Sequence, residues 1–150
     1  MHYLSFLRQV AFVLLATLFL AGCARQEIGL VGEWRGTGMD GKRFVLILEP
    51  DRSFRMITGD QAIDTSAHPD TLYRWSADET RTPHRLTLTT IEGDQTLAIP
   101  VIYDLLDPST LAIRFGVTPR GEPVAWEQLN WDAENPGSQR LVLERTPPAD

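Results

Sequence analysis

The chain has 150 residues, with 14 basic and 20 acidic side chains and a formal net charge of −6 at pH 7. This length suits a single domain. Because Arg8 is the only charged side chain before Cys23, the 128 residues after position 22 have a formal charge of −7. A domain with this excess of acid is a poor binder of nucleic acid or anionic lipid surfaces, so we expect neither as a partner.

Residues 1–22 have the three parts of a secretory signal peptide. Arg8 gives positive charge, Val10–Ala21 is a twelve-residue run without a charged side chain, and Ala21-Gly22 offers small side chains for cleavage. A membrane-spanning helix needs roughly 20 apolar residues, so this run is too short to span. Leu20-Ala21-Gly22-Cys23 resembles the lipobox of bacterial lipoproteins, in which the leader is cut just before a cysteine that carries lipid.

The resemblance implies three segments: residues 1–22 as a removed signal peptide, 23–29 as a lipidated tether and 30–146 as the folded domain. Cys23 is then the lipid attachment residue, and because it is the only cysteine, the domain folds without a disulfide. Two or more acyl chains anchor a protein stably in a membrane. Ala24 stands where an aspartate would favour the inner membrane in the enterobacterial pattern, which implies the periplasmic face of the outer membrane. Alternatively, the leader is an ordinary signal peptide and Cys23 is incidental.

Beyond the tether, helical periodicity is almost absent, and short runs with the two-residue period of β-strands recur along the chain. Pro50-Asp51, Glu92–Gln95 and Asp107–Ser109 have the residue types of turns. Pro100 lacks an N–H, so it predicts a bulge or an edge position. The expected strands are Leu30–Gly36, Phe44–Leu48, Ser53–Met56, Leu72–Ser76, Leu86–Thr89, Leu97–Tyr103, Leu111–Phe115 and Arg140–Arg145. About eight strands joined as neighbours favour an all-β antiparallel meander, which closes into a barrel to remove its edges.

Gly32-Glu33-Trp34 resembles the Gly-x-Trp motif that opens the first strand of lipocalins and related barrels. In that superfamily the tryptophan plugs the closed end and an arginine near the end of the last strand covers its ring. The resemblance therefore implies a barrel-closing pair of Trp34 and Arg145, held by a cation–π contact. Alternatively, Trp34 is a core residue of a β-sandwich.

Several later segments are similar to small, uncharacterised bacterial domains of lipocalin-like type. These segments are Pro83–Leu88, Ile102–Leu106, Ser109–Leu111 and the final Leu143-Glu144-Arg145. Those domains have no established activity, so the resemblance implies a fold and supplies no catalytic residue.

The motifs of common enzymes are absent from the sequence. No serine lies in a Gly-x-Ser-x-Gly elbow, and there is neither a Gly-rich phosphate loop nor a Cys/His zinc spacing. We therefore predict no catalytic residue, no cofactor and no enzyme activity. Asp60, Asp64, His68 and Asp70 form the most metal-like group, since their spacing would place three of them on one side of a helix. Their surroundings are typical of a solvated polar loop, so no metal is expected.

Residues 116–139 form the one long connection, longer than most loops. Trp126 and Trp131 within it could form a lid over a barrel mouth or a docking surface, and Val124–Trp131 could add a strand. Alternatively, the two tryptophans pack beneath their own loop.

Two functions remain open. The first is a membrane-anchored module that binds a small apolar or lipid-like ligand in the barrel. The second is a structural or regulatory lipoprotein that docks an envelope protein through its surface. Many large side chains are expected inside, which favours a filled barrel and hence the second function: Phe44, Leu46, Leu48, Phe54, Met56, Leu111, Ile113 and Phe115.

Overall fold

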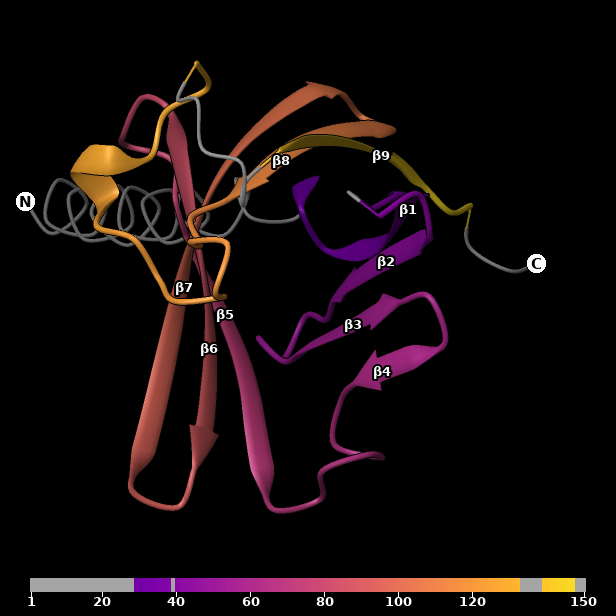
Figure 1. Ribbon diagram of the computed structural model, residues 1–150. Coiled ribbons are helices and arrows are strands. Elements are labelled where there is room, and N and C mark those ends of the chain that lie inside the picture. The colour runs from indigo at the N-terminus through magenta and orange to yellow at the C-terminus, as the bar shows by residue number, and fades with distance from the viewer. Residues whose placement is uncertain (1–28, 39, 133–138, 148–150) are drawn as a thin grey trace, which may run out of the picture.

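The computed structural model describes residues 29–38, 40–132 and 139–147. Within these ranges the chain is all-β and forms one antiparallel sheet (Figure 1). The predicted signal peptide, Cys23 and the predicted tether up to residue 28 lie outside the described residues. The strands are β1 (Gly32–Thr37), β2 (Arg43–Leu48), β3 (Phe54–Thr58), β4 (Gln61–Ile63), β5 (Thr71–Asp78), β6 (His84–Glu92), β7 (Gln95–Asp107), β8 (Thr110–Phe115) and β9 (Arg140–Arg145).

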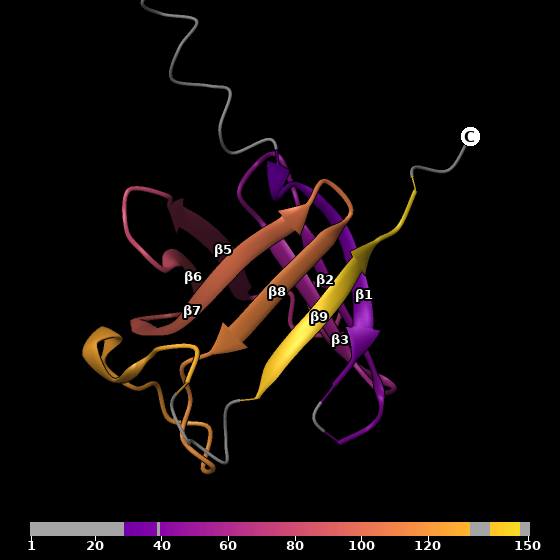
Figure 2. The ribbon, with the colours of Figure 1, turned by 90° about the horizontal axis from the view of Figure 1, so that it is seen from above.

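The order of the strands in the sheet is β4-β3-β2-β1-β9-β8-β7-β6-β5. Strands that follow one another in the chain are therefore neighbours, except that β9 returns to pair with β1 and β4 is separated from β5. Figure 2 shows β7, β8, β9 and β1 side by side along one wall of the curled sheet. The expected all-β antiparallel meander is confirmed, with nine strands in place of about eight.

The register of the strands determines which side chains point into the concave side of the sheet. Trp34 faces Leu46 of β2, and Leu111 faces Leu143 of β9. Alternate residues on each strand point inward, so one cluster of apolar side chains fills the concave side. The most deeply buried members are Leu30, Trp34, Leu46, Leu48, Leu86, Val101, Leu111, Ile113 and Leu143.

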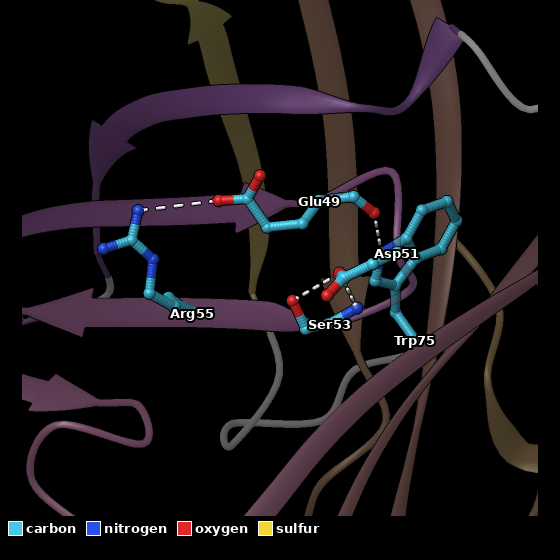
Figure 3. A network of polar contacts seen from close by, with 5 residues as sticks. All are labelled: Glu49, Asp51, Ser53, Arg55 and Trp75. Carbon is cyan, nitrogen blue, oxygen red and sulfur yellow. Dashed lines mark hydrogen bonds and ion pairs between the residues drawn. The ribbon is translucent and has the colours of Figure 1, made fainter.

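The two ends of the curled sheet come into contact where the β2–β3 turn meets the edge strand β5, a place that we call the seam. Ser53, the residue before β3, forms an isolated antiparallel bridge with Arg74 of β5. The backbone N–H of Trp75 donates to the carbonyl of Arg52 at 2.8 Å. Its indole Nε1 donates to the carbonyl of Glu49 at 3.0 Å, as Figure 3 shows. The turn between β2 and β3 is thus fastened to the middle of β5.

Three details of the predicted elements need correction. The ninth strand is β4, whose three residues lie in a region that was assigned to a polar loop. Val124–Trp131 is not a strand, since Trp126–Gln128 forms a short 3-10 helix. The bulge in β7 lies between Leu105 and Asp107, not at Pro100.

Pro100 occupies an edge position on one side only. The N–H of Gly116 donates to its carbonyl at 2.6 Å, beyond the last residue of β8. In an antiparallel strand the N–H and C=O of one residue point to the same neighbour. The missing N–H of Pro100 therefore faces Gly116, whose carbonyl accepts a hydrogen bond from the N–H of Val124 at 2.9 Å instead.

Candidate ligand-binding pocket

Trp34 lies near the start of β1 and is fully buried. The guanidinium carbon of Arg145 lies 4.5 Å from the centroid of the Trp34 ring, so the predicted contact is present. The indole Nε1 donates to the carbonyl of Leu30 at 2.8 Å. Leu30, Trp34 and Arg145 define what we call the closed end.

Arg145 also fastens the first described residues to the last strand. Its guanidinium donates to the carbonyl of Val31 at 3.2 Å and to the carbonyl of Gly29. These bonds hold the segment before β1 across the closed end of the sheet. A planar guanidinium suits this position because one face can stack on the indole while the edge donates to several carbonyls.

A pocket of about 450 Å³ lies at the other end of the sheet, which we call the open end. Its position follows from strand direction: Leu141 lines it from the start of β9, whereas Arg145 ends the same strand at the closed end. The lining is mostly apolar. It consists of Gly38, Asp40, Phe44, Met56, Thr58, Ile99, Phe115, Val117, Gly121 and Leu141.

The aromatic part of the lining is ordered by mutual packing. Phe44 and Phe115 meet edge to face, with ring centroids 5.9 Å apart and an interplanar angle of 76°. Phe44 is buried in the core cluster, and Met56 and Ile99 are half-buried against it. These side chains form an apolar wall beneath an opening to solvent.

Among the described residues that line the pocket, Asp40 is the only ionisable one. Its Oδ1 accepts a hydrogen bond from the backbone N–H of Lys42 at 3.0 Å, and its Oδ2 lies 3.5 Å from the Lys42 ammonium. The backbone hydrogen bond and the nearby lysine hold the pKa of Asp40 below its usual value. The rim therefore has an ion pair, while the interior is apolar.

Trp126 and Trp131 do not line this pocket. Arg85 of β6 covers the ring of Trp126 at 4.7 Å, and Arg140 of β9 covers the ring of Trp131 at 5.2 Å. Both arginines alternate with inward residues of their strands, so the two tryptophans lie against the outer face of the sheet. The long connection supplies Val117 and Gly121 to the lining instead.

The acidic loop between β4 and β5 is organised by Asp64. Its carboxylate accepts hydrogen bonds from the backbone N–H groups of Ser66 and Ala67 and from the Ser66 hydroxyl. These bonds lower the pKa of Asp64. Across the parts of the chain that the structure describes, no three His, Cys, Asp or Glu side chains are grouped closely enough to hold a metal ion.

Sequence reasoning missed a polar cluster around Tyr103, which is 2% exposed. Its hydroxyl donates to Glu79 Oε1 at 3.3 Å, and the His84 ring lies against the tyrosine ring, 5.4 Å between centroids. Burial and the neighbouring carboxylate raise the pKa of Tyr103, so the phenol stays neutral at neutral pH. The cluster is outside the pocket and serves to pair a buried hydroxyl.

Among the described residues, no helix has the length and apolar character needed to cross a bilayer. Comparison of the chain with models of known protein families, with curated proteins and with solved structures finds no match.

Proposed function

We propose that this chain is a membrane-anchored bacterial lipoprotein that binds a small apolar or lipid-like ligand in a lipocalin-like barrel. In this proposal Cys23 carries the lipid, the seam closes the curled sheet into a barrel, and the pocket at the open end holds the ligand. The periplasmic face of the outer membrane is the proposed location. No catalytic step is proposed.

The observation that carries the ligand-binding function is the pocket itself. Small-molecule sites in proteins have volumes of about 300–1,000 Å³ and predominantly apolar walls. The pocket has about 450 Å³ between Phe44, Met56, Ile99, Phe115 and Leu141. The large inward side chains leave this space at the open end, which favours ligand binding over a barrel filled throughout.

Binding can be tested with N-phenyl-1-naphthylamine, a neutral apolar dye whose fluorescence rises in apolar surroundings. Ile99 lines the pocket, whereas its neighbour Ala98 is exposed on the opposite face of β7. Ile99→Trp should fill the pocket and abolish dye binding, and Ala98→Trp is the matched control that should bind normally. If the wild type binds no apolar probe, or if the two variants behave alike, the ligand-binding function is wrong and docking of an envelope protein becomes the leading function.

The anchor is tested separately with Cys23→Ser. Without the thiol no lipid can be attached, so we expect an uncleaved precursor or a soluble product. The fold should be unchanged because no disulfide is lost. Detergent-phase partitioning distinguishes the outcomes, and a variant that is cleaved yet still membrane-bound would contradict lipid anchoring through Cys23.

A further inference from the structure

We propose that the open end of the barrel cannot face the bilayer that anchors the protein. The ligand is then exchanged with the aqueous compartment on the side of the protein that points away from this bilayer. This inference rests on the proposed function above, and it adds the route by which ligand reaches the pocket. It follows from where the tether leaves the domain and from how long the tether is.

The tether leaves at the closed end. The carbonyl of Gly29, the first described residue, accepts a hydrogen bond from Arg145, next to the buried Trp34 ring. A methyl group built on Gly29 would lie 3.6 Å from Leu105 Cδ2, near the end of β7. The path from the lipid therefore reaches the domain at the base opposite the pocket.

The open end lies far from this point along the same strand. Ile99 lines the pocket six residues before Leu105, and β7 starts at Gln95. At about 3.3 Å per residue, Leu105 is about 20 Å from Ile99 and about 33 Å from Gln95 along the strand. Figure 1 shows β5, β6 and β7 as long neighbouring strands. The turn that joins β6 to β7 precedes Gln95 and therefore lies further along β7 from Leu105 than Ile99 does.

The tether is shorter than the distance along β7 from Leu105 to the hairpin tip at Gln95. Six residue steps join Gly29 to Cys23, and a fully extended chain spans at most about 3.6 Å per step, which gives at most about 22 Å. For the mouth to press on the anchoring bilayer, the hairpin tip would have to touch it first, with Gly29 about 30 Å above the surface. The lipid at Cys23 would then be pulled out of the membrane.

Negative charge at the β6–β7 hairpin tip also opposes contact between the open end and the membrane. Glu92 and Asp94 flank the turn between β6 and β7 and are exposed. Two carboxylates at the most projecting point are repelled by an anionic leaflet. Both length and charge therefore keep the open end away from the membrane that holds the lipid.

The experiment uses the lipidated protein reconstituted in phosphatidylcholine vesicles and a pyrene-labelled monoacylglycerol as the probe. Uptake is followed with the probe either in the protein's own vesicles or in separate vesicles. The wild type should show no rate advantage for its own vesicles. Inserting twelve Gly/Ser residues between Gln26 and Glu27 lengthens the tether by about 40 Å. This variant should take up probe from its own vesicles about tenfold faster, because the mouth can then reach them.

The matched control carries the same insertion after Pro148, where it leaves the tether unchanged, and it should behave as the wild type. Faster uptake by the wild type from its own vesicles would overturn the inference, as would an equal advantage in both insertion variants. If the protein binds the dye in solution but shows either of these contradicting uptake results, only the proposed route of ligand exchange is wrong. If neither assay detects binding, the proposed ligand-binding function itself is wrong.

Discussion

All four tryptophans of the chain lie beneath an arginine guanidinium. The distances from guanidinium carbon to ring centroid are 4.5 Å for Arg145 on Trp34, 4.6 Å for Arg52 on Trp75, 4.7 Å for Arg85 on Trp126 and 5.2 Å for Arg140 on Trp131. Arginine suits this role because its planar, weakly hydrated cation can stack on an indole. The chain has thirteen arginines and one lysine, and at each of the four tryptophans the cation that covers the indole ring is an arginine.

Among these pairs, Trp34 and Arg145 should matter most for stability. Trp34→Ala removes a fully buried indole and should lower the free energy of unfolding by about 3–5 kcal/mol. Arg145→Ala should cost less, since it leaves the indole in place. Arg145→Lys keeps the charge but loses the planar fork that bonds Gly29 and Val31, so it should resemble Arg145→Ala. Urea unfolding measures all three, and full stability in Arg145→Lys would show that charge alone suffices.

Arg52 occupies a backbone conformation that normally favours glycine, with φ at +70°. It closes the turn between β2 and β3, and its guanidinium covers Trp75 across the seam. A left-handed residue other than glycine costs on the order of 1 kcal/mol. Arg52→Ala should lose the indole contact and keep the strain, whereas Arg52→Gly loses the contact and relieves the strain. We therefore expect Arg52→Gly to be the more stable variant by about 1 kcal/mol in urea unfolding, and the reverse order would contradict this account.

At the scale of elements, five turns are organised by an aspartate that accepts the backbone N–H two residues ahead. The pairs are Asp40 with Lys42, Asp51 with Ser53, Asp64 with Ser66, Asp78 with Thr80, and Asp107 with Ser109, at 2.8–3.0 Å. The pKa of each carboxyl group is lowered. In Asp51, Asp64, Asp78 and Asp107 the main cause is a hydrogen bond from a serine or threonine hydroxyl, with the backbone N–H bonds adding to it, and in Asp40 the main cause is the backbone bond from Lys42. Asp64 differs from the others in being buried.

The lowered pKa of Asp64 predicts a pH dependence of stability. Because the unfolded chain binds the proton more readily, Asp64 stabilises the fold above the unfolded pKa of about 3.9. This contribution is lost as the pH falls through the lower pKa of the folded state. Asp64→Asn keeps a side-chain acceptor without the charge, so the stability difference between wild type and variant should shrink from pH 6 to pH 2. Denaturation at several pH values measures it, and a constant difference would exclude a role for the charge.

The elements also show what the sequence could predict. The hairpin of β2 and β3 was predicted because alternating residues and Pro50-Asp51 determine a hairpin locally. Gly36 was expected only as a strand end, yet a methyl group there would lie 2.7 Å from Leu143 Cδ2. Close approach between β1 and β9 depends on the whole fold and has no local signal. The strand β4 was missed because three residues give no measurable period.

The pocket was predictable only in part. The alternation of side chains along each strand identified Phe44, Met56 and Phe115 as interior residues. Whether an empty pocket remains between them depends on how all the strands curl together. Val117 and Gly121 belong to a loop whose path no periodicity describes. The two tryptophans of that loop lie on the outer face because Arg85 and Arg140 offer cationic partners there, which side-chain alternation alone did not reveal.

At the scale of the whole molecule, the seam is where the residue before β3 pairs with the edge strand β5. Ser53 and Arg74 are direct partners across it, and the adjacent ring contact of Phe54 with Tyr73 has centroids 5.5 Å apart. The bond from Trp75 N–H to the Arg52 carbonyl joins the residues on either side of this pair, so Ser53 and Arg74 form a non-hydrogen-bonded pair. In such pairs the side chains are close to each other, as a disulfide requires.

Ser53→Cys with Arg74→Cys should therefore form a disulfide under mild oxidation, since in the lipidated protein Cys23 has no free thiol. The bond closes a loop of about twenty residues, so the oxidised form should be more stable than the reduced form of the same variant by about 3 kcal/mol. Thiol titration and urea unfolding measure this. Thiols that stay free, or an oxidised form less stable than the reduced one, would show that the sheet is open at the seam in solution. Because ligand is proposed to enter at the open end, locking the seam should leave the dye affinity unchanged, and loss of binding on oxidation would place the entry route at the seam.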